Sequence, residues 1–286
     1  MSSPQRFYVI GDPVAHSISP QMQTAALKSL GLPHTYEALR VAPYELAAVL
    51  DRVRRGAIHG LNVTVPHKIA VLALLDQSMD EVGVTGAANT VWVDRTGRLV
   101  GANTDVDGLR ADLLGEGVTP QRVLVLGAGG AARACVFSCS MLGAEVSVGA
   151  RRDDEAHRLT RSLGRGAAVP WTTLDAGAPY DLVINATSAG MAGGPDGTDV
   201  AAAWERAPKT GAAVAYDLIY RPPAGMPTTL MLARAAAQGH RALDGLGMLV
   251  EQGVRALSIF LGTPLDSTVR TAMRQAATEA LRRPHS

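Results

Sequence analysis

Lys68 follows an apolar run and is the residue whose type most suggests proton chemistry. Residues 58–65 have the composition of a buried strand, and Pro66, which cannot donate a ladder hydrogen bond, is expected to end it. Lys68 would then project from a strand end, where a rigid scaffold can aim a side chain into a cleft. It is one of only three lysines among 27 basic residues. Lysine, unlike arginine, can give up its proton in a protein, so Lys68 is a candidate general acid or base; a solvated surface lysine is the alternative.

Two serines stand together at the predicted start of the first helix. Pro20 suits the first helical position of a helix running to Leu30, and Ser19 would be its N-cap. Ser17 lies two residues earlier. Hydroxyls and free backbone N–H groups at a helix N-terminus favour an anion, so this pair is a candidate carboxylate site. A purely structural cap would account for Ser19 but leaves Ser17 unexplained.

Further polar residues lie at or near the ends of predicted strands. Asp105 precedes a predicted helix over residues 108–114, which it could simply cap. The ends of parallel strands in an open α/β sheet share one edge, so these residues could converge on one cleft with Lys68. They are Asn62, Thr64, Asn89, Asn103 and Asp105.

A dinucleotide-binding pattern begins at Gly127. Residues 122–126 are almost continuously apolar, as in a parallel strand buried on both faces. They lead into Gly127-Ala128-Gly129-Gly130-Ala131-Ala132, a GxGxxA turn, then a helix to Leu142 and a second strand over residues 144–149. A glycine turn between strand and helix lets a pyrophosphate approach the helix N-terminus.

The residues after that second strand favour NADP over NAD. A protein that binds NAD usually places an acidic residue there to hold the ribose 2′-hydroxyl. This chain has Arg151 and Arg152 instead, which would pair with a 2′-phosphate. Two solvated arginines are the alternative, although cations are unfavourable at a helix N-terminus without an anion.

The composition excludes several classes of protein. A formal net charge of +1 without a basic block argues against nucleic-acid binding. No run of about 18 apolar residues is present, which argues against a membrane span. The polar residues 1–6 do not form a secretory signal, so a cytoplasmic location is expected. Cys135 and Cys139 lie four apart on one predicted helix, which makes them core residues rather than a disulfide or a metal site.

Over nearly its whole length the sequence resembles the shikimate dehydrogenase family, NADP-dependent enzymes that reduce 3-dehydroshikimate in aromatic amino-acid biosynthesis. Several separate blocks in the same order carry the resemblance, which makes it more specific than any single motif. They are residues 11–20, 62–68, 86–90, 103–105, 127–133, 185–190 and 244–252.

The resemblance implies a role for each candidate residue. Lys68 and Asp105 look like the family's catalytic pair, and Ser17 and Ser19 would hold the substrate carboxylate. The other substrate-binding residues implied are Thr64, Asn89, Tyr220 and Gln252. The residues implied for NADP are Gly127, Ala128, Gly129, Gly130, Ala131, Arg151 and Arg152, with Leu218 and Gly245 lining the nicotinamide site.

The implied fold is α/β with two domains. Residues 1–107 and 240–286 would form a substrate domain built from both chain ends, and residues 108–239 a Rossmann domain between them. The implied protein is a monomer or homodimer that binds small molecules and no metal. A quinate/shikimate or aminoshikimate-type dehydrogenase is the alternative; Ser19 favours shikimate, because quinate-using paralogues often carry Thr there. His67 has no role in this interpretation.

Overall fold

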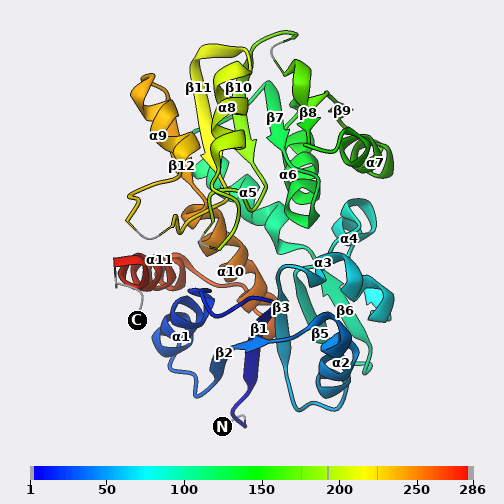
Figure 1. The fold of residues 1–286 in the computed structure, drawn as a ribbon. Helices are drawn as coiled ribbons and strands as arrows, with labels where there is room; N and C mark the ends of the chain where they lie inside the picture. The colour runs from blue at the N-terminus through cyan, green and yellow to red at the C-terminus, as the bar shows by residue number, and fades with distance from the viewer. Residues whose placement is uncertain (1–2, 175, 192, 224, 283–286) are drawn as a thin grey trace. The chain divides into compact units, whose positions relative to one another are not determined.

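The protein consists of two compact units, each an α/β structure (Figure 1). The computed structural model describes residues 3–174, 176–191, 193–223 and 225–282. Of the described residues, 3–108 and 249–282 form one unit, and those within Leu109–Met248 form the other. The chain passes between them within two helices, α5 (Thr104–Gly115) and α10 (Leu246–Leu261). The predicted α/β class with two domains is confirmed.

The first unit is built on a mixed six-stranded sheet. Strand β5 is antiparallel to its two neighbours, while the other pairs are parallel. In spatial order the strands are β2 (Thr35–Arg40), β1 (Arg6–Gly11), β3 (Gly60–Val63), β5 (Thr90–Val93), β6 (Leu99–Ala102) and β4 (Gln77–Ser78).

Helices cover this sheet and bury its apolar side chains. The helices are α1 (Ser19–Ser29), α2 (Leu46–Arg54), α3 (His67–Ala70), α4 (Asp80–Thr85), α10 and α11 (Ser267–Arg282), with 3-10 turns at Pro43–Glu45 and Val71–Leu74. Leu50 and Val53 of α2 share a core with Leu61 of β3. Phe260 of α10 stacks on Phe7 with ring centroids 5.1 Å apart. A Cβ at Gly60 would lie 2.5 Å from the Phe260 ring, so only glycine lets this helix approach β3.

The second unit is a six-stranded sheet in which every pair is parallel. The strands in order are β12 (Arg241–Asp244), β11 (Lys209–Asp217), β10 (Tyr180–Asn185), β7 (Arg122–Leu126), β8 (Glu145–Gly149) and β9 (Ala167–Ala168). Alternate residues of β7 point to opposite cores, Val123 and Val125 to one and Leu124 and Leu126 to the other. This burial on both faces explains the apolar run over residues 123–126 that follows Arg122.

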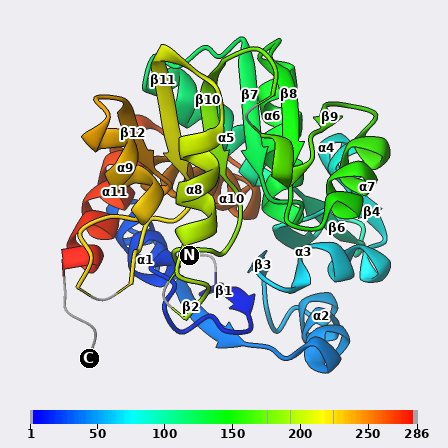
Figure 2. The same ribbon diagram turned by 45° about the horizontal axis from the view of Figure 1, so that its top comes forward.

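Helices lie on both faces of this second sheet (Figure 2). On one face the core takes in α5 together with α6 (Gly130–Met141) and α7 (Asp153–Leu163); on the other it takes in α8 (Thr198–Arg206) and α9 (Leu230–Ala237). A 3-10 turn lies at Trp171–Thr173. Cys135 and Cys139 are both buried, as expected of core residues, and burial raises the pKa of Cys139 to about 12. Within the described ranges, no helix combines the length and apolar character needed to cross a bilayer.

The structure corrects several local expectations. Ser19 is the first helical residue of α1 rather than its N-cap, which is Ile18. The strand expected over residues 58–65 is β3, Gly60–Val63 only. Residues 240–248 belong to the second unit, because β12 pairs with β11 and extends that sheet.

Candidate active site

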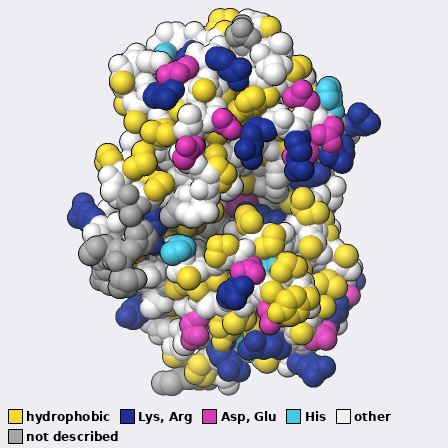
Figure 3. Space-filling model, viewed as in Figure 1, with side chains coloured by type: hydrophobic (Ala, Val, Ile, Leu, Met, Phe, Trp, Pro, Cys, Tyr) yellow, Lys and Arg dark blue, Asp and Glu magenta, His cyan; other side chains and the backbone are white. Residues whose placement is uncertain are grey.

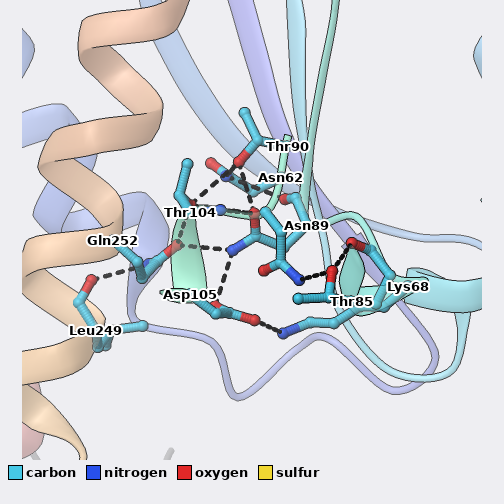
Figure 4. Close-up of polar contacts among 11 residues, drawn as sticks. Asn62, Lys68, Thr85, Asn89, Thr90, Thr104, Asp105, Leu249 and Gln252 are labelled. Atoms are coloured by element: carbon cyan, nitrogen blue, oxygen red, sulfur yellow. Dashed lines mark hydrogen bonds and ion pairs between the residues drawn. The ribbon is translucent and has the colours of Figure 1, made fainter. Parts of the chain in front are cut away.

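Lys68 and Asp105 form an ion pair in the first unit (Figure 4). Lys68 Nζ lies 2.5 Å from Asp105 Oδ2, and the two side chains are 16% and 8% exposed. Lys68 lies in α3, and its backbone carbonyl accepts a hydrogen bond of 2.8 Å from Ala88 N just before β5. Asp105 is the second residue of α5. The two candidate residues are therefore in direct contact. Each is carried by a helix, Lys68 by α3 and Asp105 by α5.

Asn89 holds the second oxygen of the same carboxylate. Asn89 Nδ2 donates to Asp105 Oδ1 over 2.8 Å, while Asn89 Oδ1 accepts from the backbone N–H of Thr104 over 2.8 Å. Gln252 of α10 lies beside it, with Oε1 3.5 Å from Asn89 Nδ2. Gln252 Nε2 donates to Leu249 O over 2.8 Å. Four of the candidate residues thus form one cluster of side chains, namely Lys68, Asp105, Asn89 and Gln252.

The serine pair and Thr64 belong to the same unit. Ser17 Oγ accepts a hydrogen bond of 3.2 Å from the backbone N–H of Ser19, so Ser17, the residue that a cap alone left unexplained, satisfies a donor at the start of α1. Thr64 follows β3 and donates its backbone N–H to Ile10 O of β1. A Cβ at Gly11 would lie 2.5 Å from Thr64 Cγ2, so glycine there lets the ends of β1 and β3 lie close together.

His67 anchors the segment that carries Lys68. Its ring is 1% exposed, and Nε2 lies 2.7 Å from the backbone carbonyl of Val41. Its backbone N–H donates to Thr64 O over 2.9 Å. These two bonds fix the start of α3 from both sides. His67 therefore has a structural explanation that its sequence context did not reveal.

The GxGxxA turn of the second unit has the geometry that a pyrophosphate requires. Gly127 adopts φ +118°, and a Cβ there would lie 3.0 Å from Ala186 O, so glycine is needed. The helix α6 begins at Gly130 with no side-chain cap, and nothing lies within 4 Å of a Cβ placed on the exposed Gly129. Uncapped N–H groups beside open space suit a phosphate anion. The residues present therefore fit the pyrophosphate of a dinucleotide such as NADP.

Arg151 and Arg152 lie just beyond the end of β8, and both are exposed. Arg151 Nη1 is 3.7 Å from Asp199 Oδ2, and Arg152 pairs with Glu155. Figure 3 shows basic and acidic side chains mixed over α7. Exposed ion pairs of this kind are weak, so both guanidinium groups can exchange a carboxylate partner for a phosphate.

The remaining candidates follow the strands of the second sheet. A Cβ at Gly245 would lie 2.1 Å from Leu218 O, so the segments after β11 and β12 are in contact there. The structure thus brings Leu218 and Gly245 together. Tyr220 is half-buried in the second unit, whereas the other candidate substrate residues belong to the first.

Three residues of this cluster have no assigned role in the sequence analysis, although Asn62 is among the polar residues expected to converge there. Asn62, Thr90 and Thr104 are buried polar residues hydrogen-bonded to Asn89 or to one another. Asn62 offers a signal, because it is the one amide within a strand otherwise made of glycine and aliphatic residues. Thr90 offers no comparable signal in the sequence, since threonine is common in strands.

Two family models match the chain. The shikimate dehydrogenase substrate binding domain matches residues 9–91, and the shikimate 5′-dehydrogenase C-terminal domain matches residues 245–278.

Full-length relatives show the same similarity. A shikimate dehydrogenase (NADP(+)) of a Synechococcus strain is 40% identical, over 98% of this chain and 96% of its own. The structure of shikimate 5-dehydrogenase from Thermus thermophilus with shikimate has a TM-score of 0.83 at 39% identity, covering 97% of this chain and 99% of that one. The same enzyme with NADP(H) and shikimate has a TM-score of 0.81 at 38% identity, covering 97% and 100%.

Proposed function

Because the chain belongs to the family of NADP-dependent shikimate dehydrogenases, we propose that it catalyses the reversible, NADPH-dependent reduction of 3-dehydroshikimate to shikimate. The proposed reaction would belong to the biosynthesis of chorismate and the aromatic amino acids. The observation that carries the proposal is the buried contact between Lys68 and Asp105, which joins a proton donor to a carboxylate in the unit matched by the substrate-binding family model.

Lys68 is proposed as the general acid and base. The cofactor, when bound, supplies the hydride to the C3 carbonyl carbon or accepts it in the reverse direction. Lys68 Nζ gives a proton to the carbonyl oxygen during reduction and takes it back during oxidation. Asp105 accepts a hydrogen bond from Nζ and so keeps the amine oriented, and it also accepts from a substrate hydroxyl. Holding the proton donor in place before the reaction lowers the entropic part of the barrier.

The other candidates would orient the substrate. Ser17 and Ser19 are proposed to hold the carboxylate at the start of α1, where the helix dipole favours an anion. The hydrogen-bonding residues proposed for the ring substituents are Thr64, Asn89, Tyr220 and Gln252. For Gln252 the support is its long 3.5 Å contact with Asn89, which leaves room for a better partner.

The second unit would hold the cofactor. Gly127 to Ala131 are proposed to receive the pyrophosphate at the N-terminus of α6. Arg151 and Arg152 would pair with the 2′-phosphate, and Leu218 and Gly245 would contact the nicotinamide end. A cytoplasmic location and a monomeric or homodimeric state stay predictions.

One assay tests the reaction. Reduction of NADP by the purified protein is followed by absorbance with shikimate, with quinate and without substrate, and repeated with NAD. We expect turnover with shikimate and NADP to exceed the other combinations. Faster turnover with quinate would contradict the proposed substrate.

Substitution of Lys68 tests its role. Lys68→Ala should lower kcat by about 10²- to 10⁴-fold, the usual contribution of a general acid, with little change in the KM for shikimate. Lys28→Ala is the matched control, because Lys28 is exposed on α1. A Lys68→Ala enzyme with near-normal kcat would remove Lys68 from the mechanism.

A further inference from the structure

We propose that Thr90 is a positioning residue that sets the orientation of the Asn89 amide, and through it the Asp105 carboxylate, for the reaction. The inference rests on the proposed role of Lys68 and Asp105. Thr90 is fully buried at the start of β5 and is separated from Asp105 by Asn89. In Figure 4 the side chains of Thr90 and Asn62 are grouped above Asn89, which lies between them and the Lys68–Asp105 pair.

The sheet register brings this group together. Asn62 of β3 is the antiparallel partner of Thr90 of β5, so their side chains lie on the same face. Tyr36 lies on β2, is 3% exposed and reaches Asn62 from the other side. No motif predicts the association, because three strands from distant parts of the chain supply it.

Three hydrogen bonds of the group run in series from Tyr36 to Asn89. Tyr36 Oη donates to Asn62 Oδ1 over 2.7 Å, and Asn62 Nδ2 donates to Thr90 Oγ1 over 3.1 Å. Burial raises the pKa of Tyr36, so its hydroxyl keeps the proton that it donates. Thr90 Oγ1, already an acceptor from Asn62, donates to Asn89 Oδ1 over 2.9 Å.

This direction determines which end of the Asn89 amide faces Asp105. Asn89 Oδ1 accepts from the hydroxyl of Thr90, and also from the N–H and hydroxyl of Thr104. Its Nδ2 is thereby turned outward to donate to Asp105 Oδ1. A flipped amide would place an oxygen against the carboxylate and an NH₂ group against the N–H of Thr104, so both contacts would be repulsive.

As a consequence, the two carboxylate oxygens of Asp105 have different hydrogen-bond donors. Oδ1 is bound by Asn89, and Oδ2 is left to Lys68 Nζ. If Thr90 loses its hydroxyl, Asn89 loses one of the donors that define its orientation, and the carboxylate can turn away from Lys68. Because Thr90 is fully buried, we expect it to make no contact with the substrate. Its effect on kcat must therefore come through Asn89.

The test compares two substitutions of Thr90 with a control. Thr90→Val keeps the shape of the side chain and removes the hydroxyl, whereas Thr90→Ser keeps the hydroxyl. The control is Thr160→Val, because Thr160 is also buried but donates to Ala156 O within α7 of the other unit. Each protein is assayed for kcat and both KM values across pH, together with its thermal stability.

We expect Thr90→Val to lower kcat for shikimate oxidation by about 10- to 100-fold, the range that misplacement of a catalytic group produces, and to alter the pH profile of kcat. Thr90→Ser should retain kcat within about twofold, and Thr160→Val should lose stability without either kinetic change. Tyr36→Phe, which removes the first donor of the series, should change kcat in the same direction by a smaller factor, and it serves as the test if Thr90→Val does not fold.

Two outcomes would overturn the inference. One is a folded Thr90→Val enzyme with wild-type kcat, and the other is a Thr90→Ser enzyme as impaired as Thr90→Val. Lys68→Ala, assayed in parallel, separates this failure from that of the proposed function. An inactive Lys68→Ala with a normal Thr90→Val refutes only the inference, whereas an active Lys68→Ala refutes the mechanism on which it rests.

Discussion

Asp105 is the residue at which the polar contacts of the first unit meet. Its two oxygens are occupied by different donors, Asn89 on one and Lys68 on the other. A partly buried carboxylate needs such partners, because an unpaired buried charge is costly. Removing either donor therefore disturbs the position of the Asp105 carboxylate relative to the other donor. For this reason, substitutions of Asn89 or Lys68 are expected to lower kcat more than they weaken ground-state binding of the substrate.

Arg151 is the residue on which the preference for NADP should depend most. Its guanidinium is exposed and only loosely paired with Asp199 at 3.7 Å. Arg151→Ala should raise the KM for NADP by about tenfold or more, the value of a charge-assisted hydrogen bond, and leave the KM for NAD nearly unchanged. The measurement is initial rate against concentration of each cofactor.

Arg158→Ala is the matched control for this prediction. Arg158 is a similarly exposed arginine on α7 that pairs with Asp154, away from the end of β8. Both KM values should stay unchanged in this variant. An equal rise in the KM for NAD and NADP in Arg151→Ala would refute a contact with the 2′-phosphate.

At the level of secondary-structure elements, the Asp217 carboxylate at the end of β11 accepts hydrogen bonds from the end of β10 and from the segment that follows β11. Its Oδ1 accepts from Asn185 Nδ2 over 2.9 Å and from the backbone N–H of Ile219 over 3.1 Å, and its Oδ2 accepts from Thr229 Oγ1 over 2.7 Å. Leu218 lies between two of these anchored residues. The segment proposed to contact the nicotinamide end is thus held by a buried carboxylate.

The burial of Asp217 makes a prediction about pH. Burial raises the pKa of its carboxyl from 3.8 to about 6, with Asp244 adding to the rise, although the three hydrogen bonds oppose it. The folded state therefore binds the proton more tightly than the unfolded state. This contribution to stability is fully present below pH 4 and is lost as the pH rises to about 6.

Asp217→Asn should remove that pH dependence. Asparagine can accept from Asn185 and Ile219, and the Thr229 hydroxyl can turn to accept from the new NH₂ group. Between pH 4 and 6 the wild-type free energy of unfolding should fall relative to the variant, by at most about 3 kcal/mol. Urea unfolding of both proteins across this range measures the difference, and parallel curves would contradict the prediction.

At the scale of the whole molecule, the two ligands are expected to bind different units. The substrate candidates other than Tyr220 belong to the first unit, and the cofactor candidates belong to the second. Saturating NADP alone should slow amide exchange in residues 127–134, while saturating shikimate alone should slow it in residues 62–68 and 103–106. Hydrogen–deuterium exchange followed by mass spectrometry measures both. Protection of residues 127–134 by shikimate alone, at a level equal to that with NADP, would contradict the division.

The local sequence determines much of the site. Gly127 is identifiable because a tight turn between a strand and a helix requires glycine there, and the structure shows φ +118°. Lys68 and Asp105 are identifiable because each follows a strand of recognisable apolar pattern. These features depend on residues near one another in the chain, so spacing alone is informative.

Other features of the site depend on contacts between residues that are far apart in the sequence. The bond from His67 to the Val41 carbonyl and the pairing of Asn62 with Thr90 both depend on the order and register of strands distant in sequence. Residues 240–248 belong to the second unit because β11 offers an edge to β12, which no property of that short segment reveals. The amino-acid sequence alone predicted which residues would do the chemistry, whereas the packing of β2, β3 and β5 brought together the buried side chains that we propose orient them.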